Sequence, residues 1–187
     1  MHPTRRGLLI GSVVMGALGT GAPPAMAAVS ARKLTTDSKR ALGALFGVQP
    51  RAREVSRRAK AALVFPRIVK AGLLIGGQTG DGALLRQGQA VGFFNLSAAS
   101  FGLQAGVERF SYALFLMNDR ALAYLEESDG WAIGSSPNIV VADKGFGRAA
   151  NTTTLREDVY AFPFGFNGLM AGVGLEGSKI TRITPDP

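Results

Sequence analysis

Hydrophobic positions recur with a helical spacing in the first part of the chain and alternate with polar or small residues in the rest. Residues 30 to 63 predict two helices. The first covers residues 38 to 46, and Gly47 and Pro50 end it because glycine and proline are helix stop signals. A separate second helix is therefore expected to begin at Arg51.

The second predicted helix is amphipathic and basic. Its apolar positions recur at steps of three and four: Ala52, Val55, Ala59, Ala62 and Leu63. Arg53, Arg57 and Lys60 fall on another face at the same steps. Two interpretations follow, since the apolar stripe can pack on the rest of the domain or can contact a lipid or a partner.

Beyond residue 66 the pattern predicts short strands separated by glycine turns. Candidate strands cover residues 68–75, 82–87, 89–97, 100–109, 111–117, 131–142, 155–162 and 167–175, with 179–183 as a last edge. Residues 119 to 126 predict one helix, with Asn118 or Asp119 as its N-cap. The expected fold class is α+β, with N-terminal helices packed on a mainly antiparallel sheet, a meander that closes into a small barrel or sandwich.

Glycines and aromatic residues mark particular positions in this sheet. The glycine cluster at residues 76–82 lacks the Gly-Lys-Ser/Thr of a phosphate-binding loop, so a hairpin turn is favoured. Trp131 follows a turn pair and begins a strand, which favours a place in the core. Residues 93–94 and 162–166 hold further phenylalanines, for which core packing is favoured over a barrel rim.

The first 27 residues have the composition of a signal peptide. Arg5 and Arg6 precede an apolar run over residues 8–18, and Ala25-Met26-Ala27 forms a small-x-small cleavage site. The arginine pair favours twin-arginine export over general secretion. An uncleaved membrane anchor is the alternative, but the apolar run is shorter than the roughly 20 residues that span a bilayer. Residues 28–187 then form one exported domain, expected in the periplasm or outside the cell.

Charge is distributed unevenly along the 187 residues, whose formal net charge is +8. Residues 28–70 contain eleven lysines and arginines against Asp37 and Glu54, whereas residues 71–187 contain eight against eleven acidic residues. The basic character therefore belongs to one N-terminal segment, which predicts an anionic partner for that segment.

The chemistry available to an enzyme is narrow. The chain has no cysteine, and its one histidine, His2, lies in the predicted signal peptide. Nucleophilic Ser-His and Cys-His pairs and nearly all zinc sites need those side chains, so no metal or cofactor is expected. Carboxylates at residues 126–129 and 157–158 are neighbours in sequence and are interpreted as solvated rather than as an acid-base pair. The chain is predicted to bind a ligand rather than to catalyse a reaction.

Several strings together resemble the SYLF domain, in an order and spacing that cover residues 35 to 183. They are AALVFPRIVKAG at residues 61–72, IGG at 75–77 with GDG at 80–82, SFGLQAG at 100–106, and GLMAGV with LEG at 168–177. The chain departs from the pattern at residues 92–95, where many members carry a tryptophan and a proline. The resemblance implies a lipid-binding module without catalytic activity, and eukaryotic members bind phosphoinositides and, in some, actin.

We therefore expect the basic segment to dock on anionic phospholipid headgroups, with apolar residues inserting shallowly. The expected lipid-binding residues are Arg53, Arg57, Arg58, Lys60, Arg67 and Lys70. Alternatives are an envelope protein that binds an acidic protein or polysaccharide, and an enzyme of unusual carboxylate chemistry. Nucleic acid could also pair with such a segment, but export makes it an unexpected partner.

Overall fold

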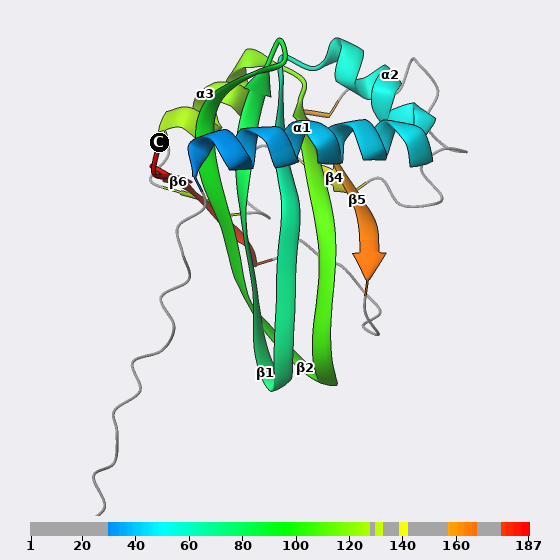
Figure 1. Cartoon of the computed structure of the whole chain (residues 1–187), viewed down its shortest axis with the longest axis vertical. Helices are drawn as coiled ribbons and strands as arrows, with labels where there is room; N and C mark the ends of the chain where they lie inside the picture. Colours follow the sequence, from blue (N-terminus) through cyan, green and yellow to red (C-terminus); the bar gives the residue numbers. More distant parts are fainter. Residues whose placement is uncertain (1–29, 128–129, 133–138, 142–156, 168–176) are drawn as a thin grey trace, which may run out of the picture.

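A computed structural model describes residues 30–127, 130–132, 139–141, 157–167 and 177–187. These residues form three helices and six strands of one sheet, in which only the β4–β5 pair is parallel. The sheet is curled into a half-barrel, and the first helix lies across it (Figure 1). The α+β fold class, with helices first and a mainly antiparallel sheet after, is confirmed.

Two helices open the described chain. Helix α1 covers Ala31–Val48, and the Ser30 hydroxyl accepts a hydrogen bond from the Lys33 backbone N–H as its N-cap. Helix α2 covers Pro50–Arg58 and has its proline at the first helical position, where the missing N–H costs nothing. The first helix thus starts well before the predicted residue 38.

The prediction that the second helix continues through Ala62 and Leu63 is wrong. Both residues lie on β1, which covers Ala61–Arg86. Five consecutive side chains, from Ala61 to Phe65, are buried because both faces of the strand are covered. An apolar run of this kind fits a helical spacing and a strand equally well, so the pattern could not separate them.

Strand β1 and strand β2, Gln89–Leu116, form one very long antiparallel hairpin. Its turn is Gln87–Gly88, where both residues have positive φ, 50° and 77°, as the two-residue type I′ turn requires. Figure 1 shows both strands descending from the helices, bending, and returning toward them. The pairing register shifts between Gly72 and Leu74, within this bend.

The two halves of β1 approach each other at glycines. A Cβ atom added at Gly82 would lie 2.6 Å from the Val64 carbonyl oxygen and 2.6 Å from Cδ1 of Phe65, and one at Gly80 would collide with the Arg67 carbonyl oxygen. The predicted hairpin turn at residues 76–82 is therefore wrong, because all seven residues pair with β2 inside a continuous strand. Gly80 and Gly82 allow two segments of backbone to lie close together, and they do not reverse the direction of the chain.

The other strands add to β2 rather than to their neighbours in sequence. Strand β5, Val159–Asn167, pairs with the returning half of β2, and β6, Lys179–Ile183, pairs with its first half. The short strands β3, Trp131–Ala132, and β4, Ile139–Val141, pair with β6 and β5. The strand at 179–183 is confirmed with its predicted bounds. The expected meander is wrong, and six of the predicted strands are parts of β1, β2 and β5.

Successive side chains of the strands supply two cores, one on each face of the curled sheet. On one face Leu63, Leu114 and Ala161 pack with Trp131 and with helix α3, Asp119–Glu127. On the other face the adjacent positions on the same three strands, such as Val64, pack under α1 and α2. Asn118 caps α3 by accepting a hydrogen bond from the Ala121 N–H at 2.9 Å, as one of the two predicted N-caps.

Most of the predicted aromatic residues are core residues, as expected. Trp131, Phe94 and Phe162 are almost completely buried, whereas Phe166 is 52% exposed and stacks on Phe110. The predicted signal peptide and the predicted strand at 167–175 lie outside the described residues, apart from Asn167. None of the helices in the described part of the chain is long and apolar enough to cross a membrane.

Replacing Gly82 by alanine is expected to destabilise the domain by about 1–3 kcal/mol, because the new methyl group must displace backbone or an aromatic ring. Gly43→Ala on α1 is the matched control, since its Cβ would meet nothing within 4 Å. That variant should gain roughly 0.5–1 kcal/mol from helix propensity. Equilibrium urea unfolding measures both values, and equal stability of the two variants would contradict the close approach of the two halves of β1.

Candidate binding surface and pocket

The six predicted lipid-binding residues lie on three consecutive segments. Arg53, Arg57 and Arg58 are exposed on α2, and Lys60 is exposed in the link that follows it. The remaining two, Arg67 and Lys70, lie on β1 rather than on a helix. The structure therefore groups three of the six on one helix, places Lys60 in the link and places the other two on β1.

Helix α2 is amphipathic, as predicted, and its two faces are clearly divided. Ala52 and Val55 are completely buried against the sheet. Arg53, Arg57 and Arg58 lie outside that buried face and are exposed. The expectation that the apolar residues of this helix insert into a membrane is therefore wrong for Ala52 and Val55, since packing against the domain already occupies them.

An aromatic ring connects α2 with α1. The guanidinium of Arg53 lies 5.5 Å from the centre of the Phe46 ring, within the range of a cation–π contact. The same ring stacks on Phe115 of β2, with ring centres 6.5 Å apart. Arg53 is thereby held over a side chain that is itself fixed to the sheet.

Acidic neighbours offset part of the basic segment. The Lys60 ammonium lies 3.1 Å from a carboxylate oxygen of Asp119, the first residue of α3. Asp37 on α1 accepts hydrogen bonds from Lys33 and from Arg40, the latter at 3.0 Å, and the positive charge of Arg67 also acts on it. Of the six expected residues, Lys60 thus has a carboxylate partner, and the charge of Arg67 acts on Asp37.

These contacts change the titration of Asp37. The hydrogen bond from Lys33 and the charges of Lys33, Arg40 and Arg67 lower the pKa of its carboxyl from the usual 3.8, against a smaller opposing effect of burial. Asp37 is therefore ionised at neutral pH. Its negative charge holds the side chains of Lys33 and Arg40 on the exposed face of α1.

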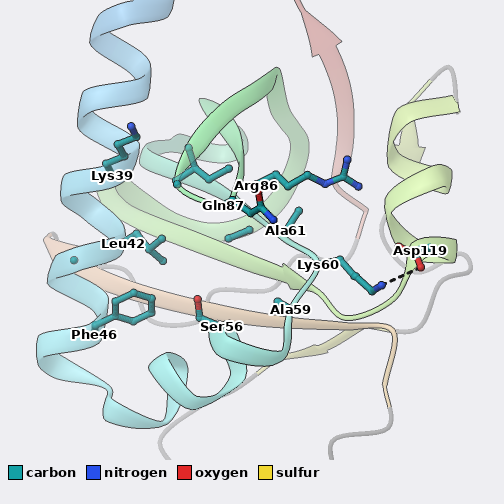
Figure 2. A pocket seen from close by; sticks show the side chains of 14 residues that line it. Lys39, Leu42, Phe46, Ser56, Ala59, Lys60, Ala61, Arg86, Gln87 and Asp119 are labelled. Carbon is teal, nitrogen blue, oxygen red and sulfur yellow. Dashed lines mark ion pairs between the residues drawn. The ribbon is translucent and has the colours of Figure 1, made fainter.

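A pocket of about 680 Å³ lies beside α2, between α1, the β1–β2 turn and the start of α3. Figure 2 shows Leu42 and Phe46 of α1 on one side and the Lys60–Asp119 ion pair on the opposite side. Ala59 also contributes to its apolar wall. This volume falls within the roughly 300–1,000 Å³ that is usual for small-molecule sites.

The polar lining of the pocket is predominantly cationic. Lys39, Lys60 and Arg86 supply three positive charges, and Asp119 supplies one negative charge. Sequence reasoning did not select Lys39 or Arg86, because they are far apart in the chain and Arg86 lies in a segment of net negative charge. The sequence marked Arg86 only as a residue next to the predicted end of a strand at residue 87.

The described residues offer little for acid-base or metal chemistry. Within the described ranges, no group of three or more His, Cys, Asp or Glu residues is placed to hold a metal ion. Asp158 accepts hydrogen bonds from Asn118, at 2.7 Å, and from Arg120, so it ties the start of β5 to α3 rather than being simply solvated. Burial raises the pKa of Tyr112 far above its ordinary value, which keeps that hydroxyl protonated.

Comparison with known families gives one match. Residues 97–184 match the family model described as Ysc84, Las17-binding protein actin regulator. The matched range begins within β2 and runs past the end of β6. A search of the curated proteins finds no match.

The carboxyl of Asp37 should titrate below 3.8 in the folded protein, and Lys33→Met should raise its pKa toward that value. Because the folded pKa is the lower one, this group stabilises the fold above the unfolded pKa, and the contribution is lost as the pH falls through the folded pKa. NMR of the side-chain carboxyl carbon measures both values. Thr36→Val on the same helix is the control, and an equal shift in both variants would contradict the assigned cause.

Proposed function

We propose that this chain docks on anionic lipid surfaces through the basic face of α2. The family match at residues 97–184, together with the resemblance to the SYLF domain, supports a binding function. The proposal assigns no catalytic activity to the chain. Arg53, Arg57 and Arg58 make the principal contacts, and Lys60, Arg67 and Lys70 extend the same basic segment toward β1.

One observation carries the proposal: α2 buries Ala52 and Val55 completely and leaves Arg53, Arg57 and Arg58 exposed. Burial of the apolar face fixes the orientation of the helix, so the cations are presented together without a folding step. A surface that offers several cations from one rigid helix suits a dense layer of anionic headgroups better than a single counter-charge.

The expected strength of this contact follows from the number of engaged charges. Each lysine or arginine near an anionic bilayer contributes about 1 kcal/mol, so three arginines give weak and reversible docking, and additional residues of the segment strengthen it. Salt screens such contacts over a Debye length of about 10 Å at 0.1 M. Docking should therefore weaken steeply as the ionic strength rises.

An acidic protein or polysaccharide of the cell envelope is the alternative partner for the same face. The description of the matched family, which names a Las17-binding protein, concerns protein binding and supports this alternative. Both partners use the same cations, so charge reversal alone does not separate them. Binding of the purified domain to protein-free vesicles does.

The proposal also includes export. Residues 1–27 would direct the chain across the inner membrane of a bacterium, by the twin-arginine route that Arg5 and Arg6 favour. The domain would then meet the outer leaflet of that membrane, or another envelope surface, from the periplasm or from outside the cell. Absence of cysteine is consistent with a contact that is non-covalent.

Reversing two charges on α2, in the variant Arg57→Glu with Arg58→Glu, should reduce binding to vesicles of mixed anionic and neutral phospholipid by roughly thirtyfold or more. The loss of two cations at about 1 kcal/mol each sets this lower limit. Flotation at low salt measures the partition coefficient. Wild-type protein should bind neutral vesicles weakly and should leave anionic ones at half-molar salt.

A control variant with the same net charge separates a local effect from a global one. Arg109→Glu with Arg182→Glu changes two exposed arginines on β2 and β6. It should retain most of the vesicle binding. If it binds as weakly as the α2 variant, or if wild type binds neutral and anionic vesicles equally, docking through α2 is wrong.

Replacing Arg5 and Arg6 by lysine preserves the charge of the leader but removes the arginine pair that the twin-arginine route recognises. Cell fractionation of a bacterium that has this route should then show the protein retained inside, with its leader uncleaved. Unchanged export of the variant would instead place the chain on the general secretion route, and retention of the unaltered chain would contradict export itself.

A further inference from the structure

We propose that the pocket beside α2 binds one anionic amphiphile, with its charged head at Arg86 and Lys60 and its alkyl chain against Leu42 and Phe46. The inference rests on the proposed lipid chemistry. The pocket would be a second site, with one ligand per chain, next to the surface that docks on the bilayer.

The division of the lining into two parts supports this ligand class. The apolar part consists of side chains that are fixed by the core under α1 and α2, among them Leu42, Phe46 and Ala59, and it can accept an alkyl chain. The cationic part has Arg86, whose guanidinium can bind a phosphate or a carboxylate by two parallel hydrogen bonds. A free inorganic anion would leave the apolar part unused, and a neutral chain would leave the cations unused.

The charges that face the pocket also favour an anion. Lys39, Lys60 and Arg86 are opposed by Asp119, which leaves an excess of two positive charges. In the described part of the chain, neither Lys39 nor Arg86 is within 4.0 Å of a carboxylate. Asp119 forms an ion pair with Lys60 at 3.1 Å, so a bound head competes with that carboxylate for the lysine.

A glycine on α1 lines the pocket at a point where there is space for a side chain. Gly43 lines it from α1 between Leu42 and Phe46, and a Cβ atom there would meet nothing within 4 Å. Gly47, one turn further along the same helix, is also exposed and also has free space around a Cβ atom, but it does not line the pocket. The pair therefore offers a substitution that fills the pocket and a matched one that does not.

Isothermal titration with octyl phosphate, below the concentration at which it forms micelles, tests the proposal on the purified domain. We expect saturable binding with one site per chain. Inorganic phosphate and octyl glucoside should each bind at least tenfold more weakly, since each has only one half of the ligand. Octanoate distinguishes the source of the head: tighter binding than octyl phosphate indicates a fatty-acid carboxylate, and weaker binding indicates a lipid phosphate.

Three variants relate the binding to named residues. Gly43→Trp should reduce the affinity for octyl phosphate at least tenfold, while Gly47→Trp should leave it within twofold of wild type. Arg86→Gln should reduce it at least fivefold, and Asp119→Asn should raise it by releasing Lys60 from its ion pair. Absence of saturable octyl phosphate binding, or equal loss in the two tryptophan variants, overturns the proposal.

The outcome is separable from that of vesicle docking. Gly43→Trp changes no charge and should dock on anionic vesicles as wild type does, whereas Arg57→Glu with Arg58→Glu should lose most of the docking and retain octyl phosphate binding. If octyl phosphate binds but the protein does not dock on vesicles, the pocket stays assigned and α2 is refuted as the docking face. If the protein docks on vesicles but does not bind octyl phosphate, the docking surface stays assigned and the pocket is refuted as a binding site.

Discussion

The structure depends on a close approach between two parts of one strand. Strand β1 returns past its own first half, and at Gly80 and Gly82 the distance between them leaves space for hydrogen but for no larger substituent. Because β2 follows β1 along its whole length, the same bend folds β2 as well. The half-barrel is thus created by one hairpin that is bent over, and β5 and β6 extend it on the two halves of β2.

This geometry explains why the basic segment is presented as it is. Curling of the sheet gives it two buried faces, and the face under α1 and α2 has no other cover among the described elements. Helix α2 therefore turns Ala52 and Val55 inward, and Arg53, Arg57 and Arg58 lie on the exposed part of the helix. The basic residues of this segment are exposed together because the core buries the apolar face of the helix that carries them.

Much of this could be predicted from the sequence, and the failures have physical causes. The fold class, the burial of Trp131, the cap at Asn118 and the basic face of α2 follow from local patterns. The second helix was predicted too long because a run of buried strand residues has no period of its own. The glycines at 76–82 were read as a turn because a close approach between residues distant in the chain leaves no trace in a local pattern.

The candidate site was predicted only in part, for a related reason. Arg53, Arg57 and Arg58 are close in sequence, so their common face could be recognised from spacing alone. The pocket combines Lys39, Lys60 and Arg86, which meet only because α1 crosses the hairpin next to its turn. The ion pair of Lys60 with Asp119 likewise depends on where α3 begins relative to the end of β2.

The ring of Phe46 belongs to both proposed sites. The ring lies under the guanidinium of Arg53, and the Phe46 side chain also contributes to the apolar wall of the pocket. A molecule that shifts this ring on entering the pocket must also shift the arginine above it. Thermodynamic linkage then acts in both directions: any change that pocket occupancy makes to the affinity of the outer surface is returned as an equal change in the affinity of the pocket.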